Sequence, residues 1–157
     1  MAYSTIAKIR QEAGFQNNDL VTDPVIEVKQ GNAFNVVKGY VARRYSVSQL
    51  SGALFTGSQA ADTLELAERL YAAGLLLNDE YSGQQMGETN GKAKIDAAQK
   101  LLDDIASGTL KLLDVNGDVF TADVPTTAGI AMELTSPPML NPKPTSSERK
   151  FNSDKKW

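Results

Sequence analysis

The chain has 157 residues, of which 41% are hydrophobic and 22% charged, and its formal net charge is −3. These proportions are ordinary for a soluble globular protein, and the length suffices for one hydrophobic core but not for two ordinary domains. The sequence contains no cysteine and no histidine. Disulfides, thiolate nucleophiles and histidine general bases are therefore excluded, so we expect neither an enzyme nor a cofactor.

Nothing in the sequence predicts contact with a membrane. The longest uninterrupted apolar run, residues 70–77, is far shorter than a spanning helix. The N-terminal residues place charged and apolar side chains at helical spacing and lack the apolar stretch of a secretory signal. We therefore expect the protein to act in the cytoplasm in which it is made.

The first 45 residues predict two helices. Ser4 and Gly14 are suitable N- and C-caps of a short first helix. Asp23 and Pro24 provide the cap and the first-position proline of a second helix, and Gly31 is a point at which that helix is open to interruption. Side chains at steps of three and four continue it to about residue 45: Ala33, Val37, Tyr40, Val41 and Arg44.

Two further helices follow a loop. Residues 46–57 show no sustained period, which predicts a long loop whose buried anchors are Leu50, Leu54 and Phe55. Ser58 caps a helix that runs to about residue 78. Its solvated face is predicted to hold Asp62, Glu65, Glu68 and Arg69. Residues 79–91 are polar and glycine-rich, which predicts a surface connection before a last helix over residues 92–107 that stops at Gly108.

After Gly108 the apolar pattern changes to alternation, and Asn116-Gly117 separates two short apolar runs. This combination predicts a β-hairpin over residues 109–123 with a type I′ turn. Asp114, Asn116 and Asp118 also match the first ligand positions of an EF-hand loop. Val119 replaces the required glycine and residue 125 is a proline instead of a glutamate, so the pattern favours a turn over a calcium site.

The last 21 residues predict an extended basic arm after a helical domain of residues 1–136. Residues 1–136 hold 11 Lys and Arg against 17 Asp and Glu, a net charge of −6, whereas residues 137–157 hold 5 against 2, a net charge of +3. Opposite charges favour docking of the arm on an acidic body. Four prolines prevent a helix or a central strand there: Pro137, Pro138, Pro142 and Pro144. We predict interface residues in the arm at Met139, Leu140, Arg149, Phe151 and Trp157.

Arg43, Arg44 and Tyr45 form the second predicted interface. Two guanidinium groups beside an aromatic ring suit contact with nucleic-acid phosphates and bases. The same arginines suit the negative end of a helix dipole or an ion pair between subunits, and we favour these roles because the body is acidic. The basic arm leaves the same choice between DNA and an acidic protein partner, and we favour the protein.

Three groups of residues carry a resemblance to a known family. The first is an apolar helix that ends in an Arg-Tyr pair: Val37, Tyr40, Val41, Arg44 and Tyr45. The second is a last helix with a glycine stop and a short strand: Leu101, Leu102, Ile105, Gly108, Leu110 and Leu112. The third is an Arg-x-Phe motif near the end of the arm, Arg149 and Phe151. In these places the chain resembles the small head-tail connector (adaptor, or head completion) proteins of tailed phages, in particular the Mu-like type.

This resemblance implies a mainly helical adaptor subunit of a homo-oligomeric ring, commonly twelve-fold. Such a ring sits in the virion neck between the portal protein and a tail-side neck or stopper protein, and it is assembled in the cytoplasm of the host bacterium. Genomic DNA passes through its channel without sequence-specific binding. A nucleic-acid-binding module, such as a small DNA-packaging subunit, is the alternative function.

Overall fold

The computed structural model describes residues 2–16, 21–46, 48–80 and 85–122, all within a unit that spans Met1–Pro125. This part of the chain contains four α-helices and no β-strand, which confirms the mainly helical class. None of these helices is long and apolar enough to cross a lipid bilayer. The elements are α1 (Ile6–Ala13), α2 (Asp23–Val41), the 3-10 turn η1 (Gln49–Ser51), α3 (Gln59–Glu80) and α4 (Gln85–Ser107).

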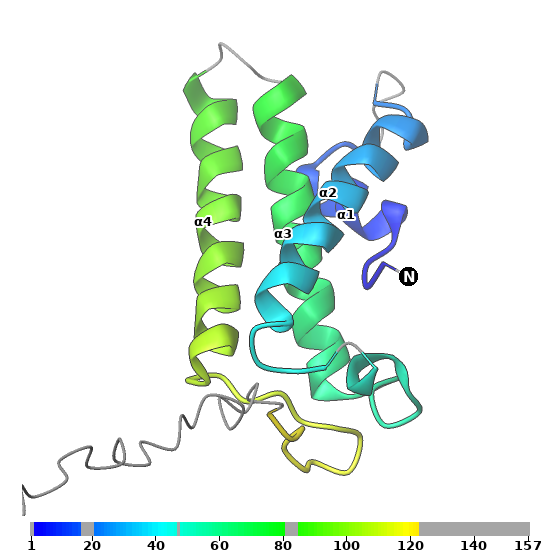
Figure 1. The fold of residues 1–157 in the computed structure, drawn as a ribbon. Helices are drawn as coiled ribbons and strands as arrows, with labels where there is room; N and C mark the ends of the chain where they lie inside the picture. Colours follow the sequence, from blue (N-terminus) through cyan, green and yellow to red (C-terminus); the bar gives the residue numbers. More distant parts are fainter. Residues whose placement is uncertain (1, 17–20, 47, 81–84, 123–157) are drawn as a thin grey trace, which may run out of the picture. The chain divides into compact units, whose positions relative to one another are not determined.

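Helix α3 is the centre of the fold and contacts each of the other three α-helices. In Figure 1, α4 runs beside α3 on one side, and α1 and α2 lie on the other. Helix α2 also contacts α4. These contacts are those of a helix bundle, in which each helix buries one face against its neighbours.

The end caps agree with the predictions in part. Ser58 caps α3 as predicted, since its Oγ accepts a hydrogen bond from a first-turn backbone N–H at 3.1 Å. Gly14 ends α1 with a φ of 79°, also as predicted. The predicted cap at Ser4 was wrong by one residue, because Thr5 is the N-cap and its side chain accepts the hydrogen bond. Helix α2 starts at Asp23, which therefore is not its cap, and it continues through Gly31 without a break.

Helix α4 begins seven residues earlier than predicted, so the polar segment before residue 92 is largely helical. Helices α3 and α4 approach each other closely at two glycines. A Cβ atom at Gly74 would lie 2.7 Å from the carbonyl oxygen of Gly91, and one at Gly91 would lie 2.9 Å from that of Gly74. Contact between the two backbones offsets the roughly 1 kcal/mol by which glycine disfavours a helix relative to alanine. Local sequence showed only the disfavoured glycines and not the neighbouring helix.

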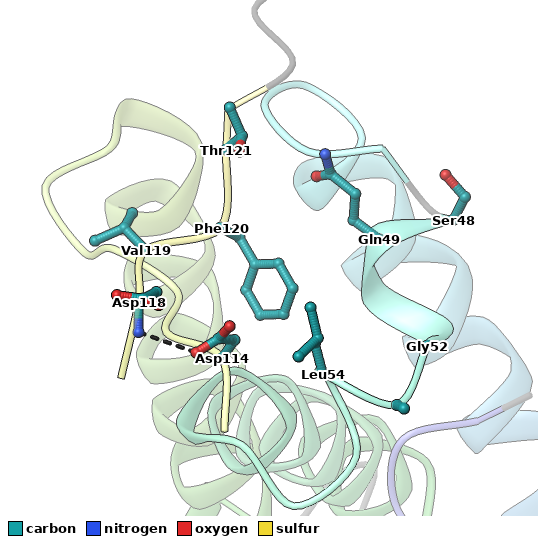
Figure 2. A pocket seen from close by; sticks show the side chains of 10 residues that line it. Ser48, Gln49, Gly52, Leu54, Asp114, Asp118, Val119, Phe120 and Thr121 are labelled. Carbon is teal, nitrogen blue, oxygen red and sulfur yellow. Dashed lines mark hydrogen bonds between the residues drawn. The ribbon is translucent and has the colours of Figure 1, made fainter. Parts of the chain in front are cut away.

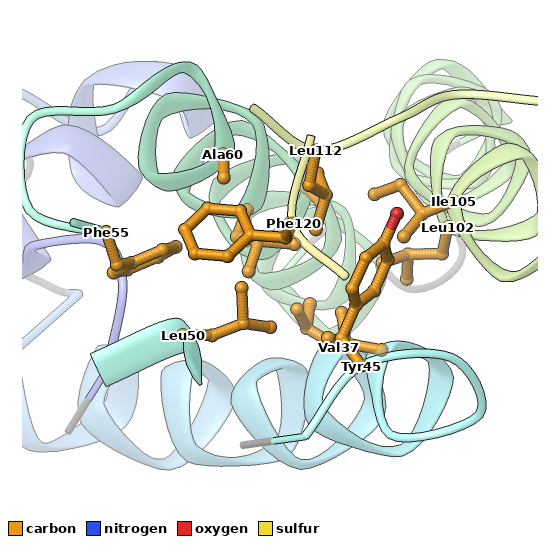
Figure 3. Close-up of a cluster of buried hydrophobic side chains, with 12 residues drawn as sticks. Val37, Tyr45, Leu50, Phe55, Ala60, Leu102, Ile105, Leu112 and Phe120 are labelled. Carbon is orange, nitrogen blue, oxygen red and sulfur yellow. The ribbon is translucent and has the colours of Figure 1, made fainter. Parts of the chain in front are cut away.

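Among the described residues, the buried apolar side chains form two core clusters. The Tyr45 cluster joins the ends of α2 and α4 to the start of α3 and to the segments around η1 and residues 112–120 (Figure 3). Its buried members are Val37, Val41, Tyr45, Leu50, Phe55, Ala60, Leu64, Ala67, Leu102, Ile105, Leu112 and Phe120. The Ile26 cluster joins α1 and the first half of α2 to the second half of α3: Ile9, Ala13, Phe15, Val21, Ile26, Ala33, Ala72, Ala73, Leu76 and Leu77.

Residues 109–122 contain a turn, which we call the closed turn because one β-bridge closes it, but no β-strand. The predicted β-hairpin was therefore wrong. The pairing consists of one isolated antiparallel bridge between Leu113 and Val119. The Asp114 carboxylate accepts hydrogen bonds from the backbone N–H groups of Asn116, at 2.8 Å, and Asp118, at 2.9 Å. Gly117, with φ 85°, is the one residue of the turn at positive φ, whereas a type I′ turn needs two. The Asp114 side chain therefore stabilises a different turn from the one that Asn-Gly predicts.

Candidate functional site

The predicted interface residues after α2 have three different environments. Tyr45 is only 2% exposed and belongs to the core. Its backbone N–H donates to the carbonyl oxygen of Val41 at 2.9 Å, so the chain makes one more turn after α2. Arg44 is partly buried and Arg43 is exposed. Tyr45 therefore does not fit its predicted role at a subunit interface, and Arg43 is the most open of the three.

Arg44 lies at the C-terminal end of α4. Its Nη1 donates to the carbonyl oxygen of Ser107 at 3.4 Å, and its guanidinium lies 5.9 Å from the ring of Tyr45. Gly108, with φ 81°, ends α4 beneath this guanidinium. A cation suits this position because the last carbonyl groups of a helix carry a partial negative charge. The helix-end role that we favoured from the sequence holds for Arg44, but the helix is α4 and not its own.

Arg43 keeps its charge at the surface. Its guanidinium carbon lies 4.4 Å from the centre of the Tyr40 ring, a cation–π contact within one stretch of chain. Such a contact at an exposed site is worth about 0.5–1 kcal/mol, which leaves the side chain free to exchange partners. Arg43 is thus the residue of this group best placed to touch phosphate or an acidic neighbour.

A hollow of about 510 Å³ lies between residues 48–54 and residues 114–121 (Figure 2). Leu54 and Phe120 point toward one another across it. The backbone N–H of Val115 donates to the carbonyl oxygen of Leu54 at 3.1 Å and so connects the two walls. Leu54 and Val119 are 51% and 49% exposed, which leaves an apolar rim open to solvent. We call this site the turn hollow.

Two carboxylates give the turn hollow a negative charge. Asp114 and Asp118 line it, and neither forms a salt bridge with any residue that the structure describes. The side chain of Asp114 faces backbone N–H groups of the turn, which is not the arrangement of a calcium loop. Within the described part of the chain, no group of three or more His, Cys, Asp or Glu residues is placed to hold a metal ion.

The sequence pointed to this hollow only indirectly. Leu50 and Phe55 are buried as predicted, but Leu54 is exposed and that prediction was wrong. A loop without a period carries no signal for which of its apolar side chains faces outward. Val119 and Phe120 stand in the second apolar run of the predicted hairpin, and the sequence did not distinguish them, although Val119 is 49% exposed and Phe120 is buried.

A buried carboxylate holds the N-terminal segment on α3. Glu68 is fully buried, and it accepts hydrogen bonds from the backbone N–H groups of Tyr3, at 2.7 Å, and Ser4, at 3.3 Å. Its predicted place on the solvated face was therefore wrong. Burial raises the pKa of Glu68, and these hydrogen bonds oppose the rise. The ring of Tyr3 packs against Phe34 and Phe55 at centroid distances of 5.5 and 5.8 Å.

The remaining predicted interface residues lie outside the described residues, as does the predicted domain boundary at residue 136. These residues are Met139, Leu140, Arg149, Phe151 and Trp157. Comparison of the chain with protein-family models, curated proteins and solved structures gives no match.

Proposed function

We propose that the chain is a structural head-tail connector (adaptor) subunit, which forms a ring between the portal and the tail in the neck of a tailed phage. The observation that carries this proposal is that two of the three features that resemble the family touch one another. Arg44, from the Arg-Tyr pair after α2, lies over Gly108, the glycine stop of α4. Fragments of chance similarity have no reason to meet in space.

The same two features also share a hydrophobic core. Tyr45 belongs to one cluster with Leu102 and Ile105 of α4 and with Leu112 beyond the glycine stop. The residues that resemble the family thus form one structural unit at the joined ends of α2 and α4. This arrangement supports a common origin of these positions.

The distribution of charge supports a ring. A closed ring with head-to-tail contacts needs two different, complementary surfaces on each subunit. The net charges of −6 in residues 1–136 and +3 in residues 137–157 give every subunit one segment of each sign. An acidic body also disfavours adhesion of DNA to the channel that such a ring surrounds.

Inactivation of the reading frame in the genome that carries it tests this proposal. Electron microscopy of the lysate should show DNA-filled heads and separate tails, and the full chain supplied in trans should restore joined particles. Normal virions without the chain would contradict the proposal. Empty heads would contradict it as well, and they would favour the alternative of a DNA-packaging subunit.

That alternative rests on the exposed Arg43 beside Tyr40 and on the basic arm. If the chain binds DNA through these cations, the logarithm of the binding constant should fall with the logarithm of the salt concentration, with a slope of about −0.9 per phosphate contact. A slope that corresponds to several contacts, reduced by about one contact in an Arg43→Gln variant, would establish it. No detectable DNA binding, or a binding constant that does not change with salt concentration, would favour the connector.

A further inference from the structure

We propose that the turn hollow receives the C-terminal arm, residues 137–157, of a second copy of this chain. The inference rests on the proposed ring, because it names the surface of each subunit to which a neighbour attaches. Three observations support it: the apolar lining of the hollow, the sign of its charge, and the place where the chain leaves the described structure.

The lining matches the apolar side chains of the arm. Leu54, Val119 and Phe120 line the turn hollow, which at about 510 Å³ has the volume of a typical small-molecule pocket. The arm carries Phe151 and Trp157, and an aromatic side chain in a partner's pocket is the usual form of an interface hot spot. Burial of one such ring also covers part of the exposed apolar rim.

The charges are complementary. The carboxylates of Asp114 and Asp118 lie at the hollow without a cation among the described residues. Another hollow, next to Tyr3, is lined by Asp62 and Glu65, but Glu65 is already paired with Lys8 at 2.6 Å, so among the described residues one unpaired carboxylate remains there against two at the turn hollow. The turn hollow is thus the better match for the basic arm, whose cations flank its aromatic residues: Arg149, Lys150, Lys155 and Lys156.

The chain leaves the described structure beside the hollow, which favours a neighbour as the acceptor. Thr121 lines the hollow, and Ala122 is the last described residue. Residues 123–136, if extended, span up to about 45 Å at 3.3 Å per residue. A domain of this size is roughly 35 Å across, so the arm can reach the next subunit. The prolines from residue 137 onward favour a stiff, extended course, which disfavours a return to the hollow of the same chain.

Trp157 is the only tryptophan and reports the docking of the arm in the full-length chain. As the protein concentration rises, its emission should shift to shorter wavelength, and the mass measured by sedimentation should rise with it. Leu54→Ser and Asp118→Lys should each raise the protein concentration at the midpoint of this shift at least about fivefold, as expected of a contact worth 1 kcal/mol or more. The matched controls, Leu66→Ser and Asp103→Lys, change exposed residues on α3 and α4 and should leave the midpoint unchanged.

Other outcomes would overturn the inference. A shift that does not depend on concentration would mean that the arm docks on its own body. Equal effects of the hollow variants and their controls, or no shift at any concentration, would exclude the hollow as acceptor. Failure of the connector proposal has a separate signature: normal virions after gene inactivation, whatever Trp157 shows. Filled heads with free tails, together with a Leu54→Ser midpoint equal to that of the wild-type chain, would support the connector proposal and exclude the hollow as the acceptor of the arm.

Discussion

Arg44 and Gly108 join the ends of two helices through a contact that depends on the absence of a side chain at position 108. A Cβ atom there would lie 2.1 Å from Nη1 of Arg44. The guanidinium occupies this space and donates to the adjacent carbonyl oxygen of Ser107. Two features therefore favour glycine here: the positive φ of Gly108, and the Arg44 guanidinium, which would have to shift to make room for a Cβ atom.

The first prediction separates these two reasons. Gly108→Ala should lower the free energy of unfolding by the 1–2 kcal/mol that a left-handed conformation costs a residue with a Cβ, and by a further amount for displacing Arg44. Gly14→Ala is the matched control, because Gly14 also has positive φ, at 79°, but no atom within 4 Å of its Cβ position. Urea unfolding of both variants measures the difference.

That difference should disappear when Arg44 is replaced by alanine, because the crowding term is then absent. If Gly108→Ala and Gly14→Ala cost the same in the wild-type background, the guanidinium moves aside without loss, and the contact does not stabilise the fold.

The second prediction concerns the close approach of α3 and α4. Gly74→Ala should destabilise the fold by about 1–3 kcal/mol, because its Cβ would lie 2.7 Å from a backbone oxygen of α4, and overpacking of this kind forces the helices apart. Gly31→Ala in α2 has open space around its Cβ and should stabilise by up to about 1 kcal/mol. Thermal unfolding of both variants shows whether each substitution lowers or raises the stability of the fold. A stabilising Gly74→Ala would show that the helices do not touch there.

The fold class was predictable because periodicity and caps are local properties. The cap of α3 at Ser58 was correct, and so was the glycine that ends α1. The errors occur where a residue far away in the sequence determines the local structure or the burial of a side chain. Glu68 lies at a position of α3 that is polar by residue type, but the N-terminal segment covers it. In α4, Gly91 lies against Gly74 of α3, a contact that the local sequence does not show.

The candidate site was less predictable for the same reason. The sequence singled out Arg43, Arg44 and Tyr45 by residue type, but not that Tyr45 is buried or that Arg44 contacts the end of α4. The turn hollow combines two segments that lie about 60 residues apart in the sequence, and no local pattern relates them. The turn itself was misjudged because a single side chain, that of Asp114, changes its type.

The third prediction is a dependence of stability on pH that originates at Glu68. Burial raises its pKa above the ordinary value of 4.5, so the folded protein holds this proton over a pH range in which the unfolded chain has lost it. The stabilisation is fully present below the unfolded pKa and is lost as pH rises through the folded pKa. The free energy of unfolding, from urea titrations at several pH values, should therefore fall over this window by an amount that Glu68→Gln abolishes.

Glu65→Gln is the control for this effect. Glu65 lies one turn earlier on α3, and its carboxylate pairs with Lys8 at the surface. The fall in stability with rising pH should persist in this variant. If both variants keep the same slope as the wild-type protein, the proton does not belong to Glu68.

The fourth prediction concerns the arm as the device of assembly. Deletion of residues 137–157 should leave the helical domain folded, because every described element lies before residue 123, and the helical circular dichroism and the melting temperature should remain unchanged. The truncated chain should no longer join heads to tails. Phe151→Ala with Trp157→Ala should reproduce this defect, since truncated hot-spot residues cost about 2 kcal/mol or more. Lys155→Gln with Lys156→Gln is the milder control, because exposed charges contribute less. Joining at normal yield by the truncated chain would show that the helices or the closed turn make the contacts that matter.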